Sequence, residues 1–132
     1  MSELSEKKIQ KFTDDLLECE QNSIAYPNLT EKYPGETIDK AYTVQRNFIN
    51  KLVDSRILGG IIGYKAALTA KSAQDAMNIR GAVIGVLFQK NQTTTESLAV
   101  DRQVAVETEF GYVTNTKIKE PVLAREVSYQ LS

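Results

Sequence analysis

The stretch VAVETEFGYV, residues 104–113, is the one around which we expect the fold to be organised. Successive side chains of a strand point to opposite faces, so this alternating pattern predicts a half-buried strand. One face would carry Glu107 and Glu109 between two small residues, with their Cα atoms about 6.5–7 Å apart. Two carboxylates this close repel each other unless a cation or a proton lies between them. The pair therefore indicates either a site for a hard divalent cation or two glutamates exposed to water.

The composition is that of an ordinary globular protein. The 132 residues are 42% hydrophobic and 25% charged, which is enough for one domain with its own core. The formal net charge of −1 gives no reason to expect nucleic acid or anionic lipid as a partner. The chain has no apolar run long enough to cross a membrane, and its first residues, MSELSEKK, do not resemble a secretory signal. We expect a single cytoplasmic domain over residues 1–132, with no nucleic-acid and no membrane partner.

The residue types limit the chemistry that the chain could perform. There is no histidine, which excludes catalytic triads and metal sites that use histidine from this chain. Cys19 is the only cysteine, and it follows Ile9, Phe12 and Leu16 at helical spacing, so it is interpreted as a core residue rather than a nucleophile. Acid–base chemistry would have to come from Asp, Glu, Lys, Tyr or Cys19.

The first part of the chain, residues 1–54, predicts two helices packed as a pair or laid against a sheet. The apolar spacing indicates an amphipathic helix over residues 5–20. Residues 22–36 form a connector, in which Tyr33-Pro34-Gly35 is typical of a type II turn. Thr37 is placed to cap a second helix that continues to about residue 54.

The second part, residues 57–132, predicts the sheet. The Gly59-Gly60 bend leads into a strand over residues 61–68, and Thr69 is placed to cap a short helix over residues 70–77. A continuous apolar run over residues 82–88 predicts a strand that is buried on both faces. A short strand over residues 97–100 and a last helix over residues 121–131 complete the list. The fold class is therefore α+β, with the helical pair on a mixed β-sheet of residues 61–68, 82–88 and 104–113.

Lys65 is a lone cation in the apolar strand over residues 61–68, where it shares a face with Gly63 and Ala67. One interpretation is a lysine whose amine extends to the surface along an apolar stem. The other is a lysine that points into a pocket to bind an anion or to move a proton. The residues alone leave both interpretations open. Its small neighbours, together with the resemblance described below, lead us to predict that Lys65 faces the same cavity as Glu107 and Glu109.

Four motifs occur in an order that resembles a known family. They are AYxVQ within residues 41–45, GYKxxLT over residues 63–69, GVLF over residues 85–88 and ExEF over residues 107–110. Together they resemble the 2-keto-4-pentenoate hydratase and 4-oxalocrotonate decarboxylase family of the fumarylacetoacetate hydrolase superfamily. The resemblance covers residues 37–113 and implies a shortened version of the hydratase-like fold.

The resemblance also implies roles for individual residues. Glu107 and Glu109 would bind Mg²⁺ or Mn²⁺, and Lys65 would lie near the substrate's keto acid as the catalytic lysine. Leu68 and Thr69 would lie where relatives contact the substrate carboxylate. The family reaction is an enolisation of a 2-keto acid, in which the metal polarises the keto oxygen and the lysine stabilises charge.

The chain departs from the family pattern at several points. Val83 stands where relatives with hydratase activity carry an Asp, and Ala67 stands where relatives usually have a glycine. Family members are about twice as long, and their third carboxylate ligand lies beyond residue 132. Two carboxylates are few for a hard cation that prefers about six oxygen ligands, so we expect metal binding to be weak or absent.

These observations predict a truncated homologue of a metal-dependent 2-keto acid hydratase or decarboxylase. Its activity would be reduced or lost, and binding of a small 2-keto acid would be retained. The alternative is an active lyase on 2-hydroxy-dienoate or 2-keto acid substrates, completed by oligomerisation or by a separate missing half. A shortened sheet would leave open edges, so we expect a homodimer or another homo-oligomer.

Overall fold

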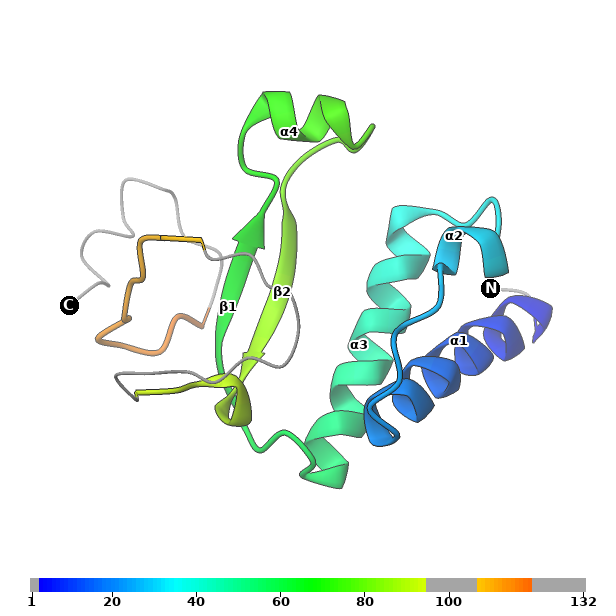
Figure 1. Ribbon diagram of the computed structural model, residues 1–132, viewed down its shortest axis with the longest axis horizontal. Helices are drawn as coiled ribbons and strands as arrows, with labels where there is room; N and C mark the ends of the chain where they lie inside the picture. The colour runs from blue at the N-terminus through cyan, green and yellow to red at the C-terminus, as the bar shows by residue number, and fades with distance from the viewer. Residues whose placement is uncertain (1–2, 95–106, 120–132) are drawn as a thin grey trace. The chain divides into compact units, whose positions relative to one another are not determined.

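The structure is a computed structural model that describes residues 3–94 and 107–119. The chain divides into two compact units, Met1–Thr95 and Glu96–Ser132 (Figure 1). In the first unit the elements follow in the order α1 (Glu3–Gln21), α2 (Leu29–Lys32), α3 (Ile38–Ser55), β1 (Ile61–Ala67), α4 (Lys71–Ala76), β2 (Val83–Phe88) and the 3₁₀ turn η1 (Gln89–Asn91). The predicted α+β class is confirmed.

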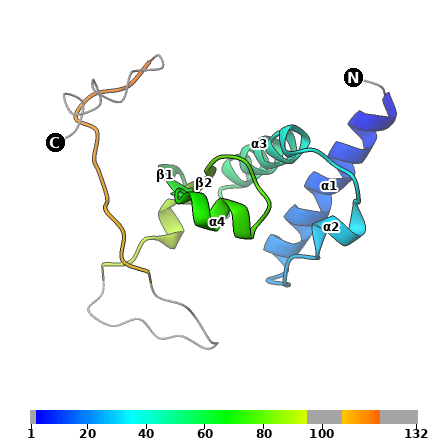
Figure 2. The ribbon, with the colours of Figure 1, turned by 90° about the horizontal axis from the view of Figure 1, so that it is seen from above.

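Helices α1 and α3 pack against each other, as Figure 2 shows, so the predicted helical pair is confirmed. Their apolar faces meet in a small core of Ile9, Phe12 and Val44, together with Tyr33 from the connector, and each of these residues is less than a tenth exposed. Helical spacing places Ile9 and Phe12 on one side of α1, and burial of that side stabilises the pair.

The ends of α3 are determined by local chemistry. Its N-cap is Thr37, as predicted, whose hydroxyl accepts a hydrogen bond from the Lys40 N–H at 3.4 Å. The connector before it contains one turn of helix, α2, which the sequence pattern did not predict. Asn28 caps α2 and accepts from the N–H groups of Thr30 and Glu31. Four residues are too short to produce a helical periodicity, so only the capping residue could have indicated this turn.

Strands β1 and β2 form an antiparallel pair, with α4 in the connection between them (Figure 1). In the described residues the sheet has these two strands, so the predicted mixed sheet is not found. The prediction that β2 is buried on both faces was wrong, since Ile84 and Leu87 are 44% and 41% exposed. Burial of both faces requires a layer on each side of the sheet, and a continuous apolar run does not show whether those layers exist.

The prediction of a strand over residues 104–113 was wrong in the part that the structure describes. Residues 107–113 do not form a strand, and every residue from 107 to 119 is exposed, with Phe110 at 93%. A strand requires a backbone partner and a surface that covers its apolar side, and neither is encoded in the alternating pattern itself. Residues 104–106 lie outside the described part of the chain.

The predicted strand over residues 97–100 and the predicted helix over residues 121–131 also lie outside the described residues. The single-domain organisation stays a prediction. Across the described ranges, none of the helices combines the length and the apolar character that crossing a bilayer requires.

Candidate functional site

A cavity of about 390 Å³ lies in the first unit between α3 and the strand pair. Its lining comes from α3 (Ile38, Ala41, Tyr42 and Gln45), β1 (Lys65 and Ala67) and β2 (Val83, Ile84, Gly85, Val86 and Leu87). Eight of these residues belong to three of the motifs described above, namely AYxVQ, GYKxxLT and GVLF, whereas Ile38, Val83 and Ile84 lie outside the motifs. Segments that are distant in the sequence therefore meet around one cavity.

Two hydrogen bonds hold α3 against the outer edge of β2. The amide Nε2 of Gln45 donates to the carbonyl of Ile84 at 3.0 Å, and the N–H of Ile84 donates to the hydroxyl oxygen of Tyr42 at 3.1 Å. Tyr42 and Gln45 are three residues apart, so both lie on the same face of the helix. A pair of side chains thus satisfies backbone groups that would otherwise be bonded by water or by a neighbouring strand.

Tyr42 and Gln45 are the functional positions whose role the sequence reasoning missed. In the sequence both stand within the AYxVQ motif of the second helix, and no bonding partner was assigned to either. Gln45, a polar amide within a largely apolar stripe, was the local indication of such a contact. A polar group on a buried face needs a hydrogen-bond partner. The sequence could not identify that partner, since Ile84 is 39 residues away along the chain.

Lys65 is half-buried and lines this cavity. The predicted alternation of β1 is confirmed here, because Gly63, Lys65 and Ala67 are half-buried while Tyr64 and Ala66 are exposed. Gly85 is the residue opposite Lys65 in the antiparallel register. Because glycine has no side chain, the lysine has space on this face of the sheet.

The two residues after β1 have different surroundings. Leu68 adopts a left-handed conformation with φ +55°, and its carbonyl accepts a hydrogen bond from Gln74 Nε2 of α4 at 2.8 Å. Thr69 is exposed and is not the helix cap, so that prediction was wrong. The N-cap is Ala70, because the chain turns into α4 one residue later than the threonine pattern suggested. The predicted contact of Leu68 and Thr69 with a substrate carboxylate stays a prediction.

Glu107 and Glu109 lie in the second unit, where both are exposed. Without a strand over residues 107–113, the pleat no longer places the two carboxylates on a common face. Their proximity to Lys65 stays a prediction.

Glu107 and Glu109 supply few of the oxygen ligands that a divalent cation requires. Carboxylate oxygens suit Mg²⁺ and Mn²⁺, but these ions prefer about six oxygen ligands. Within residues 3–94 and 107–119, no group of three or more acidic, Cys or His side chains is gathered as a metal site would require. Glu107 and Glu109 by themselves do not fit a tight metal centre, and weak binding stays the expectation.

No family model matches the chain, and no curated protein matches it. The resemblance to the hydratase and decarboxylase family therefore depends on the motifs alone.

Proposed function

We propose that this chain is a homologue of the 2-keto acid hydratases and decarboxylases that binds a small 2-keto acid in the Lys65 cavity and has little or no hydratase activity. One observation carries the proposal. Residues of AYxVQ, GYKxxLT and GVLF, which are the motifs behind the resemblance, line the same cavity.

The chemistry of the lining supports a small carboxylate with a short apolar body. The ammonium group of Lys65 provides a positive charge for the carboxylate, and a charge-assisted hydrogen bond of this kind is stronger than a neutral one. Ile38, Val83 and Leu87 provide apolar walls. The volume of about 390 Å³ lies within the usual range for small-molecule pockets.

The same lining supports the low activity. Val83 lines the cavity at the position where active relatives carry an Asp, and its isopropyl group cannot move a proton. Of the residues that line the cavity, Tyr42 and Lys65 are those with titratable side chains. The described lining therefore provides no Asp or Glu carboxylate that could transfer a proton to or from the bound keto acid.

An active lyase is the second candidate function, since Lys65, Glu107 and Glu109 are all present in the sequence. In that case oligomerisation or a separate partner would complete the active site. Hydration of 2-hydroxypenta-2,4-dienoate in the presence of Mg²⁺ or Mn²⁺ distinguishes the two candidates. Turnover that Lys65→Gln abolishes would favour the lyase, and its absence would favour a binding module.

Calorimetric titration with 2-oxobutanoate tests the binding itself, with butanoate as the ligand that lacks the keto group. We expect weak saturable binding that Lys65→Gln reduces by about tenfold, because the charged partner of the carboxylate is removed. Lys90→Gln is the matched control, since Lys90 is an exposed lysine of η1 outside the cavity lining. Equal effects of both variants, or no binding to the native chain, would contradict the proposal.

A further inference from the structure

A second and larger cavity, of about 760 Å³, lies in the first unit where α1, α2 and α3 meet the turn after α4. Its floor is formed by the helical core, including Ile9, Phe12 and Val44. Its other side is formed by Met77 and Ile79. Most of the residues that surround this space are therefore apolar, which is typical of cavities that bind small molecules.

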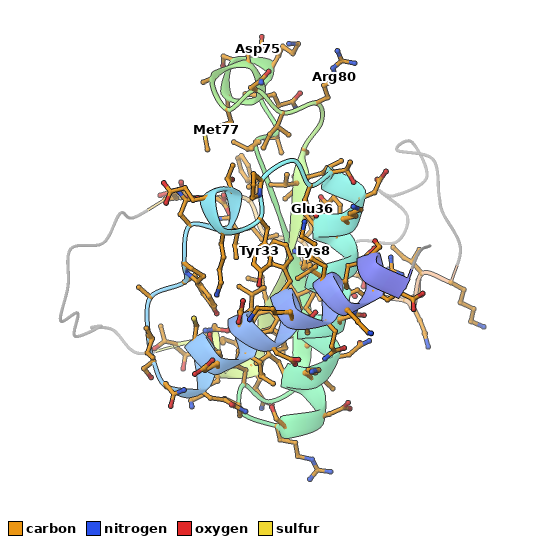
Figure 3. The ribbon with its side chains drawn as sticks, turned by 90° about the vertical axis from the view of Figure 1, so that its right-hand side faces the viewer. Lys8, Tyr33, Glu36, Asp75, Met77 and Arg80 are labelled. Atoms are coloured by element: carbon orange, nitrogen blue, oxygen red, sulfur yellow. The ribbon has the colours of Figure 1, made fainter. Side chains whose placement is uncertain are left out.

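The charged residues of this lining are Lys8, Lys40 and Glu36 (Figure 3 labels Lys8 and Glu36). Glu36 accepts from Lys8 Nζ at one carboxylate oxygen and from Lys40 Nζ at the other, both at 2.7 Å. These hydrogen bonds, first from Lys40 and then from Lys8, lower the pKa of Glu36. Glu36 therefore stays ionised near neutral pH, and the three side chains together carry a net charge of +1.

The two lysines have further capacity to bind a ligand. Each ammonium group has three N–H donors, and one donor of each is used by Glu36. Their side chains are 47% and 41% exposed, whereas that of Glu36 is 17% exposed. The cationic groups are thus more accessible than the anionic group between them, so an incoming anion would meet the lysines.

We propose that this cavity binds an amphipathic monocarboxylate, such as a medium-chain fatty acid. The apolar chain would lie between the helical core and residues Met77 and Ile79. The carboxylate would lie at Lys8 and Lys40, where it neutralises the excess positive charge. This site is distinct from the Lys65 cavity, although Ile38, Ala41 and Gln45 of α3 contribute to the walls of both.

The probe is decanoate, titrated below its micelle concentration and followed by the backbone amide signals of the full chain. We expect saturable shifts at Val44 and Ile79. Lys8→Gln should weaken binding by about fivefold to tenfold, because one ammonium partner is lost. Glu36→Gln should tighten binding by a similar factor, because it removes the carboxylate that competes with the ligand for both lysines.

Decanol has the same ten-carbon chain as decanoate but no charge. It therefore tests the apolar part of the cavity separately from the two lysines. Its affinity should not respond to Lys8→Gln or Glu36→Gln. Met77→Ser should weaken decanol and decanoate alike, and it should not unfold the chain because Met77 is 62% exposed. Lys51→Gln, which changes an α3 lysine outside this lining, should leave decanoate binding unchanged.

Lys65→Gln distinguishes this inference from the proposed function, since it should weaken 2-keto acid binding by about tenfold and leave decanoate binding intact. Shifts that do not saturate, or that spread over surfaces remote from the cavity, would overturn the proposal. So would a decanoate affinity that Lys8→Gln and Glu36→Gln both leave unchanged.

Discussion

Asp15 links α1 to α2 through its carboxylate. It accepts hydrogen bonds from Lys32 Nζ at 2.7 Å and from the hydroxyl of Tyr33, and its side chain is 14% exposed. The bond from Lys32, followed by that from Tyr33, lowers the pKa of Asp15 to about 2. Burial, with a further contribution from Asp15, raises the pKa of Tyr33 to about 12. The ring of Tyr33 also contacts Phe12, so this polar network lies directly on the helical core.

The first prediction is that Asp15→Asn lowers the free energy of unfolding near neutral pH by about 1–2 kcal/mol. The pKa of Asp15 is below its ordinary value of 3.8 in the folded chain, so its contribution is present above about pH 4 and is lost as the pH falls toward 2. The difference between native chain and variant should therefore shrink over this range. Urea unfolding in buffers of different pH measures this difference in the free energy of unfolding. Asp54→Asn, the same charge change on α3, is the control, and an equal pH response in both variants would contradict the prediction.

At the scale of the element, α3 is the helix on which both cavities depend. It begins at the Thr37 cap and ends where Arg56 adopts a left-handed conformation with φ +56°. Between these ends it contributes Val44 to the helical core and Tyr42 with Gln45 to the edge of β2. One amphipathic helix thus connects the helical core with the strand pair.

The second prediction is that Thr37→Ala destabilises the chain by about 1 kcal/mol, because the Lys40 N–H loses the acceptor that caps the helix. Thermal unfolding followed by circular dichroism measures the loss. Thr37→Ser keeps the hydroxyl and should restore most of the stability. A serine variant as unstable as the alanine variant would show that the methyl group, rather than the cap, matters.

The third prediction concerns the bonds between α3 and β2. Tyr42→Phe removes the hydroxyl that accepts from the Ile84 N–H, so this amide should exchange with solvent about tenfold faster. The amide of Gly85, which pairs with Lys65 inside the ladder, is the internal control. Equal acceleration at Ile84 and Gly85 would mean that the variant loosens the whole unit, and it would contradict a local role for Tyr42.

At the scale of the whole molecule, the strand pair keeps an apolar face that is exposed. Ile62, Tyr64 and Ile84 are 50%, 71% and 44% exposed, and the register places Tyr64 and Ala66 opposite Val86 and Ile84. An apolar sheet face of this kind favours association, since its burial removes apolar area from water. The expectation of a homodimer or another homo-oligomer is therefore maintained as a proposal.

The fourth prediction is that the native chain shows a concentration-dependent mass in light scattering at micromolar concentration. Tyr64→Lys should shift it toward the monomer, because a charge at this position would have to be desolvated on association. Met77→Lys places the same charge at an exposed apolar residue away from the strands and should leave the mass unchanged. A native chain that is monomeric at every concentration would contradict the prediction.

Local patterns in the sequence were sufficient for α1, α3 and the strand β1. The apolar spacing around Ile9 and Phe12, the Thr37 cap and the alternation around Lys65 each depend on residues within a few positions of one another. Such features stabilise an element wherever it lies in the fold, because they act through its own backbone and one face. Lys65 lines a cavity on this face of β1, whereas the predicted cavity shared with Glu107 and Glu109 stays a prediction.

Tertiary structure decided the features that need a distant partner. The pattern of residues 107–113 is that of a strand, yet a strand forms only where another backbone and an apolar surface are available. The apolar run of β2 likewise could not reveal that its outer edge is covered by Tyr42 and Gln45 instead of a further strand. The motifs meet at one cavity because these two side chains bond to Ile84, 42 and 39 residues along the chain, and a local pattern does not encode a contact of that separation.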